Sequence, residues 1–147
     1  MAEAIIAGLI RNQVLPAQKI IAAGPRPERG SELVERYGIR FTADNAEAVS
    51  AADIVILAVK PQKLRTVLAG LRGKIAPHAV VLSIIAGASI QSISSGLEHP
   101  AVIRAMPNTP AQIGQGITVW TSSPAVTEAQ LEAARLILSA PGTGNLR

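Results

Sequence analysis

The sequence has 147 residues, about the length of one domain, and 48% of its residues are hydrophobic while 16% are charged. This composition supplies enough apolar material for a packed core and excludes a disordered or low-complexity chain. The absence of cysteine excludes disulfides, thiolate metal sites and a cysteine nucleophile, and it fits a cytoplasmic protein.

The formal net charge of +4 raises the alternative of a nucleic-acid binder, but the cations are spread along the chain. The only local cluster consists of Arg26, Arg29, Arg36 and Arg40. Three aromatic residues are too few for a stacking platform, and no apolar run approaches the roughly 18 residues that span a bilayer. We therefore expect neither nucleic acid nor a membrane as a partner.

The first third of the chain alternates helix-like and strand-like segments. Apolar residues recur at helical spacing over residues 1–10 and predict a helix. Pro27 and Gly38 mark the first turn and the left-handed end of a second helix. Asp44 and Glu47 form a capping box for a short third helix. Strands are expected between these helices, at residues 19–23 and 39–41.

The centre of the chain contains two buried strands. Residues 53–59 and 79–85 are nearly continuous apolar runs rich in β-branched side chains, as expected for strands buried on both faces. Between them, Pro61 begins a helix that Gly73 ends. This order predicts a βαβ unit with parallel strands.

The last third continues the alternation. The pattern predicts a helix at 89–97, strands at 101–106 and 117–121, a stiff loop at 107–110, and a helix at 127–138 that residues 139–144 interrupt. With no linker or repeat, residues 1–147 are expected to form a single α/β domain, a parallel sheet with flanking helices.

Three loops that leave predicted strands are candidates for a binding site, at residues 58–61, 83–88 and 106–110. In an open parallel sheet, ligands bind outside the carboxyl ends of the strands, where helix N-termini present free N–H groups. Gly87 permits close backbone approach, and the prolines around Asn108 and Thr109 hold those residues in place. Turn chemistry alone is the alternative for each loop, but together the loops favour a shared binding crevice.

Few side chains suit catalysis. His78 and His99 lie in polar, proline-flanked connections and are expected at the surface. The carboxylates fall on first turns of helices or on exposed faces, without the pairing that hydrolysis needs, and no nucleophile is flanked by a base. The pattern favours chemistry performed by a bound cofactor, such as hydride transfer, and we assign no catalytic residue and no metal ligand.

The chain contains five short motifs in this order: Met1-Ala2-Glu3-Ala4-Ile5-Ile6, Asp44-Asn45-Ala46-Glu47, Ala58-Val59-Lys60-Pro61-Gln62, Ala86-Gly87 followed by Ser89-Ile90, and Met106-Pro107-Asn108-Thr109-Pro110-Ala111. The ordered set resembles the pyrroline-5-carboxylate reductases and matches their N-terminal, cofactor-binding part. The resemblance implies a Rossmann-like oxidoreductase of proline biosynthesis that reduces the imine of 1-pyrroline-5-carboxylate to L-proline with NADPH or NADH.

The resemblance also implies which residues form the site. It assigns cofactor contacts to Gly24, Arg26, Asn45, Ala58, Val59, Lys60, Pro61, Ile84, Ile85 and Ala86, and the wall of the imine pocket to Asn108 and Thr109. Independently of the resemblance, the ammonium of Met1 and the first N–H groups of its helix, at Met1 and Ala2, can attract the cofactor's phosphate. No carboxylate follows the strand at 19–23 to take the 2′-hydroxyl of NAD, whereas Arg26 or Arg29 can meet a 2′-phosphate. We therefore expect NADP in preference to NAD.

The chain departs from the family pattern at both ends. The family begins with a strand and a glycine-rich turn that bind the pyrophosphate, and it ends with a helical dimerisation domain. We therefore expect a truncated fold, in which another segment fills the place of the central strand or its neighbours close up, and poor activity of the chain alone. The alternative is a non-catalytic nucleotide-binding module, or a subunit completed by a partner chain or by self-association through the gap.

Overall fold

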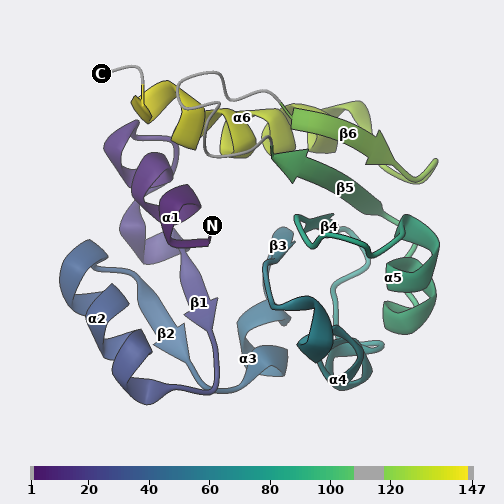
Figure 1. Ribbon diagram of the computed structural model, residues 1–147, viewed down its shortest axis with the longest axis horizontal. Coiled ribbons are helices and arrows are strands. Elements are labelled where there is room, and N and C mark those ends of the chain that lie inside the picture. Colours follow the sequence, from purple (N-terminus) through teal and green to yellow (C-terminus); the bar gives the residue numbers. More distant parts are fainter. Residues whose placement is uncertain (1, 108–117, 146–147) are drawn as a thin grey trace.

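A computed structural model describes residues 2–107 and 118–145, and its strands form two separate sheets (Figure 1). The smaller sheet pairs β1 (Ile21–Ala23) with β2 (Arg40–Thr42) in parallel. The larger sheet contains β3 (Ile54–Leu57), β4 (Val80–Ser83), β5 (Val102–Pro107) and β6 (Thr118–Ser122), in that order. Strands β3, β4 and β5 are parallel, as predicted, and β6 adds an antiparallel edge strand.

The helices are α1 (Ala2–Arg11), α2 (Pro27–Tyr37), α3 (Asn45–Val49), α4 (Leu64–Leu71), α5 (Ile90–Leu97) and α6 (Glu128–Asn145), with short 3-10 turns η1 (Ala17–Lys19) and η2 (Pro61–Lys63). Their ends follow the local signals. Gly38 ends α2 with φ 75° and donates its N–H to Val34 O. Asp44 Oδ1 caps α3 by accepting from the N–H groups of Ala46 and Glu47. The predicted ends of both helices are thus confirmed, but the predicted capping box is only half formed. Asp44 N donates to Thr42 Oγ1, and the Glu47 carboxylate accepts from the same hydroxyl.

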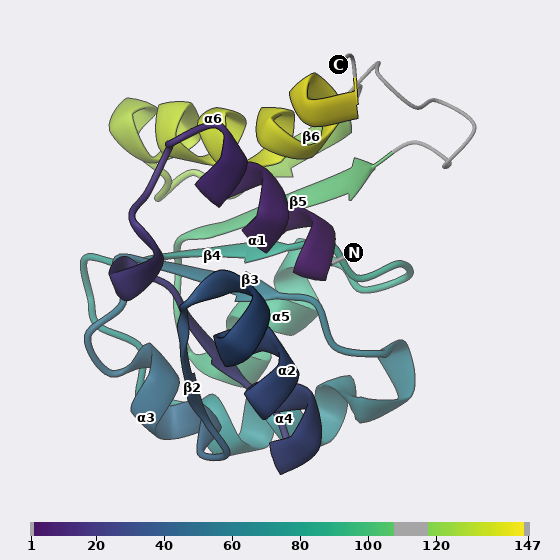
Figure 2. The same ribbon diagram turned by 90° about the vertical axis from the view of Figure 1, so that its left-hand side faces the viewer.

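The larger sheet lies between two helical layers (Figure 2). On one face, α4 and α5 cover the strands with Leu68, Leu71, Ile93 and Leu97. On the other face, α1 and α6 lie side by side, and their apolar side chains pack on Val80, Leu82, Ile103 and Ala105. Strand β4 is buried at every position, which explains its unbroken apolar sequence.

Helix α1 takes part in the packing of both sheets. Ile5 and Leu9 belong to the core cluster of the larger sheet. Ile6, on the neighbouring face of the helix, packs with Leu33 and Ile39 in the cluster that covers the smaller sheet. All five side chains are at least nine-tenths buried. The helix therefore connects two cores that the strands leave separate.

Strands β1 and β3 each have one edge without a neighbouring strand among the described residues. Val80 N donates to Asp53 O, so the backbone groups of Asp53 point toward β4. Alternate residues of a strand direct their N–H and C=O groups to the same side, and the backbone groups of Val55 therefore also point toward β4. The backbone groups of Ile54 and Ile56 then point to the other edge of β3, where the described residues place no strand. We predicted that another segment would fill this gap or that its neighbours would close up, but the described residues place no strand there and do not pair β1 with β3.

The predicted break of the last helix at residues 139–144 is wrong, because α6 continues to Asn145. Proline and glycine in this stretch lower its intrinsic helix propensity, but packing along a neighbouring element can override propensity, and α6 lies along α1. None of the described helices combines the length and hydrophobicity that crossing a bilayer requires.

Candidate functional site

The loops that leave β3 and β4, and the carboxyl end of β5, lie on the same side of the molecule as the beginning of α1 (Figure 2). This arrangement follows from the parallel strands, whose carboxyl ends meet at one edge. The third loop contains Asn108 and Thr109, which lie outside the described residues. The assigned substrate contacts therefore stay predictions.

The loop after β3 presents its backbone at the surface. Ala58 and Lys60 are exposed and Val59 is partly buried. Pro61 begins η2, and Lys63 N donates to Lys60 O at 2.8 Å, so the loop turns sharply into α4. This compact turn offers a ligand backbone groups and the ammonium of Lys60.

The loop after β4 begins in the core and reaches the surface within a few residues. Ser83 is fully buried, and its Oγ accepts a hydrogen bond from Ile85 N at 3.3 Å. The Ile85 side chain belongs to the core beneath α5, whereas Ala86 and Gly87 are exposed. Gly87 has φ 79°, a conformation that favours glycine. A ligand at this rim can therefore meet the backbone of Ala86 and Gly87, but not the side chain of Ile85.

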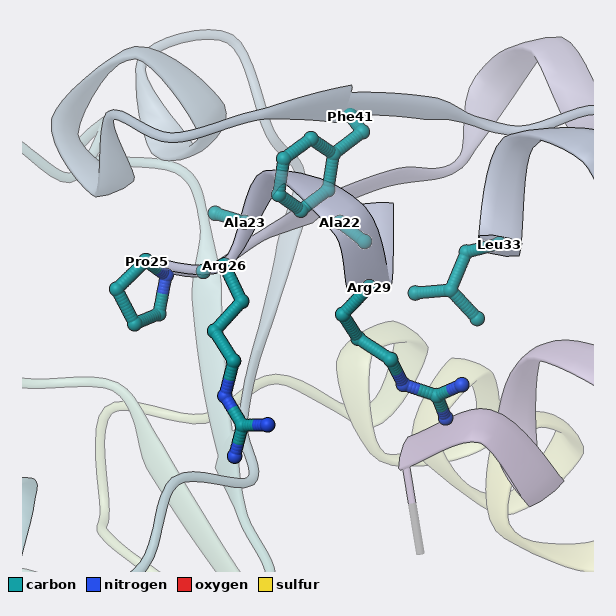
Figure 3. Close-up of a pocket in the computed structure, with 8 residues that line it drawn as sticks. Ala22, Ala23, Pro25, Arg26, Arg29, Leu33 and Phe41 are labelled. Atoms are coloured by element: carbon teal, nitrogen blue, oxygen red, sulfur yellow. The ribbon is translucent and has the colours of Figure 1, made fainter. Parts of the chain in front are cut away.

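A pocket of about 230 Å³ opens at the end of β1 (Figure 3). Its lining comes from β1, the loop after it, the first turns of α2, and β2: Ala22, Ala23, Gly24, Pro25, Arg26, Arg29, Leu33 and Phe41. Phe41 packs directly on α2, where Gly30 leaves room for its ring. Among the described residues, two arginines and no acidic residue line the pocket.

The two arginines of the pocket differ in their partners. In Figure 3 both side chains extend from the start of α2, and the guanidinium of Arg29 lies beside α1. Arg29 Nη2 forms an ion pair with Glu3, and its Nη1 lies 3.5 Å from Glu32 Oε1. Arg26 is exposed and forms no side-chain hydrogen bond or ion pair within the described part of the chain. Arg26 is thus the free cation of this pocket.

Glu3 binds more donors than any other carboxylate within residues 2–107 and 118–145. Besides Arg29, its carboxylate accepts from Tyr37 Oη and from Arg36 Nη1, each at 2.7 Å. The hydrogen bonds from Tyr37 and Arg29 lower the pKa of Glu3 from 4.5 to about 2, and that from Arg36 contributes. The sequence alone does not reveal this cluster, because a glutamate in the first turn of a helix is common and only the fold brings α2 to it.

Three other predicted cofactor residues follow β4, follow β2 and begin α1. Ile84, directly after β4, is partly buried and packs against the core beneath α1 and α6. Asn45 is the first residue of α3, directly after the cap Asp44, and it is partly buried. Ala2 begins α1, next to Glu3. Met1 lies outside the described residues. The structure therefore places Asn45 at the carboxyl end of β2, beside the strand that carries the pocket.

The two histidines have different environments. His78 is exposed, as predicted, but its Nε2 lies 2.8 Å from Asp53 Oδ1, a contact between loops that the sequence does not reveal. The prediction that His99 lies at the surface is wrong. His99 is only 5% exposed, and its Nε2 donates a hydrogen bond to Ala79 O at 2.6 Å, which compensates for burying this polar atom in the core.

Comparisons with known proteins agree with this geometry. Residues 1–87 match the family described as NADP oxidoreductase, coenzyme F420-dependent. A pyrroline-5-carboxylate reductase of Synechocystis is 44% identical over 142 residues, which are 97% of this chain and 53% of that protein. The chain thus spans about half the length of this relative.

Solved structures show the same fold. The structure of a pyrroline-5-carboxylate reductase from Coxiella burnetii matches with a TM-score of 0.88 and 30% identity, over 96% of this chain and 53% of that one. The Plasmodium falciparum pyrroline carboxylate reductase, solved with NADP bound, matches with a TM-score of 0.78 at 21% identity, over 95% and 51% of the two chains. The predicted Rossmann-like fold and the resemblance to these reductases are confirmed. On the family match over residues 1–87, the chain belongs to the family described as NADP oxidoreductase, coenzyme F420-dependent.

Proposed function

We propose that this chain is the dinucleotide-binding part of a pyrroline-5-carboxylate reductase, which reduces the imine of 1-pyrroline-5-carboxylate with NADPH in proline biosynthesis. The similarity to named reductases over nearly the whole chain supports this proposal. The chemistry is hydride transfer, which the cofactor supplies when it is bound. The residues of this chain bind and orient it.

The observation that carries the proposal is the pocket after β1, which contains Arg26 as a free cation and no carboxylate. In dinucleotide-binding folds, an acidic residue at this position binds the 2′-hydroxyl of NAD, and an arginine accommodates the 2′-phosphate of NADP. We assign the 2′-phosphate to Arg26. The exposed backbone of the loops after β3 and β4 then faces the remainder of the dinucleotide, with Ala86 toward its nicotinamide end.

Calorimetry with NADP⁺ and NAD⁺ tests the cofactor assignment. Arg26→Ala should weaken NADP⁺ binding by about tenfold or more, because it removes a charge-assisted hydrogen bond, and it should leave NAD⁺ binding unchanged. Arg65→Ala is the matched control, since it removes an exposed arginine from α4, outside the pocket. The proposal is contradicted if Arg26→Ala weakens the binding of NADP⁺ and NAD⁺ equally, or if neither cofactor binds the chain at millimolar concentration.

A turnover assay tests the reaction. We expect the chain alone to oxidise NADPH slowly with 1-pyrroline-5-carboxylate, because it spans about half the length of the reductase that it matches. The rate is followed as loss of NADPH absorbance, with a full-length reductase as the reference. A rate near that of the full-length reductase would contradict this expectation and would show that the chain alone contains a complete active site.

Within the described residues, β1 and β3 each have an edge without a neighbouring strand, which favours a second candidate function, a non-catalytic nucleotide-binding subunit completed by a partner or by a second copy. Exposed strand edges are templates for pairing with another strand. Light scattering should then show association that depends on concentration. A monomer that turns over substrate would contradict this candidate.

A further inference from the structure

Glu3 joins the first turn of α1 to one face of α2. Its three partners are Arg29, Arg36 and Tyr37. Arg36 and Tyr37 follow Arg29 by seven and eight residues, about two helical turns, so all three can reach the same side of that helix. The Glu3 side chain is 28% exposed, so solvent reaches the cluster only in part. The carboxylate is held in one place by two guanidinium groups and a phenol.

Arg29 belongs both to this cluster and to the pocket after β1. Each end of its guanidinium already faces a carboxylate, Glu3 at Nη2 and Glu32 at Nη1. A phosphate that approaches Arg29 must compete with these carboxylates and is repelled by them, whereas Arg26 presents its full charge. The two arginines are therefore unequal ligands for an anion.

We propose that Glu3 sets the preference of this pocket between a nucleoside with a phosphomonoester and one without it. By pairing with Arg29, the Glu3 carboxylate lowers the affinity for the phosphomonoester and leaves Arg26 as the main phosphate ligand. The proposal rests on the proposed function, because it concerns the 2′-phosphate of NADP, and it names the residue that tunes the preference. Glu3 acts through Arg29 and is a positioning residue. Its low pKa keeps the carboxylate charged near neutral pH.

The probe is adenosine 2′-monophosphate, titrated into the chain by NMR, with adenosine as the uncharged reference. Glu3→Gln removes the charge and keeps the size of the side chain. Its single carbonyl oxygen can accept from Arg29 or from Tyr37, which donate to different oxygens of the Glu3 carboxylate. We expect adenosine 2′-monophosphate to bind about fivefold more tightly to Glu3→Gln, the size of one partly exposed ion pair, and adenosine to bind unchanged. Glu32→Gln is the matched control, because Glu32 pairs with the same guanidinium but is 59% exposed. It should change the affinities for adenosine 2′-monophosphate and for adenosine by less than about twofold.

A double-mutant cycle separates specificity from loosened helix packing. In an Arg29→Ala background, Glu3→Gln should no longer improve binding, because the group that Glu3 holds is absent. Thermal unfolding of each variant confirms that the fold is kept. A gain that persists without Arg29, an equal gain for adenosine, or no gain in phosphate binding would overturn the proposal.

Failure of the proposed function is a separate outcome. If Glu3→Gln gains affinity for adenosine 2′-monophosphate while NADP⁺ does not bind the chain, the role of Glu3 stands and the cofactor proposal fails. If NADP⁺ binds with the predicted dependence on Arg26 and Glu3→Gln changes nothing, only the role of Glu3 fails. If no variant binds adenosine 2′-monophosphate, the role of Glu3 is refuted.

Discussion

Gly30→Ala tests how Phe41 forms the wall of the nucleotide pocket. Gly30 is buried in α2, and a Cβ atom there would overlap the Phe41 ring. In an open helical position the same change stabilises a protein by about 1 kcal/mol, because alanine has the higher helix propensity. Overpacking against a ring costs about 1 to 3 kcal/mol, so we expect a net loss of about 1 kcal/mol in the free energy of unfolding.

Urea and thermal denaturation measure this change, and a midpoint about 3 °C lower is expected for a chain of this size. Gly70→Ala in α4 is the matched control, because nothing lies within 4 Å of its added Cβ, and it should stabilise the protein by several tenths of a kcal/mol or more. In a Phe41→Ala background, Gly30→Ala should behave like this control. If Gly30→Ala alone stabilises as much as Gly70→Ala, the ring does not pack on α2 as described.

Three further predictions concern acid stability, the buried histidine and the open sheet edge. Since the pKa of Glu3 is lowered from 4.5 to about 2 on folding, its stabilisation is complete above pH 4.5 and is lost as pH falls toward 2, so the difference in unfolding free energy between wild type and Glu3→Gln should shrink over that window. His99→Leu should cost about 1 to 3 kcal/mol in chemical denaturation, because it leaves Ala79 O without its donor, and a neutral result would contradict the buried bond. The amide of Ile54 should exchange with deuterium faster than that of Val55, which faces β4, and equal protection would indicate that the edge of β3 is covered.

The sequence predicts most of the fold because its local signals are strong. Buried parallel strands require continuous apolar runs, and the runs near Val55 and Val81 are therefore visible without a structure. Capping residues such as Asp44 mark helix ends by local hydrogen bonds. The end of α6 could not be predicted in this way, since tertiary packing decides whether a helix continues through proline and glycine.

The candidate site was less accessible to sequence reasoning, because its electrostatics depend on contacts over long sequence separations. Arg26 and Arg29 look equivalent in the sequence, three residues apart. The contact with Glu3, 26 residues before Arg29, is what distinguishes them. The pairing of His78 with Asp53 and the burial of His99 likewise depend on loops that the fold brings together.

The position of α1 has a consequence for how the molecule melts. The strands of the two sheets share no ladder among the described residues, yet Ile5 and Ile6 of one helical turn belong to the cores on either side. Detaching this turn would expose apolar surface in both halves together. This short helix therefore couples the unfolding of the two halves, together with α3, whose Val49 belongs to the core beneath α4 while α3 also contacts β1 and β2. A ligand anchored at the beginning of α1 would restrain both halves.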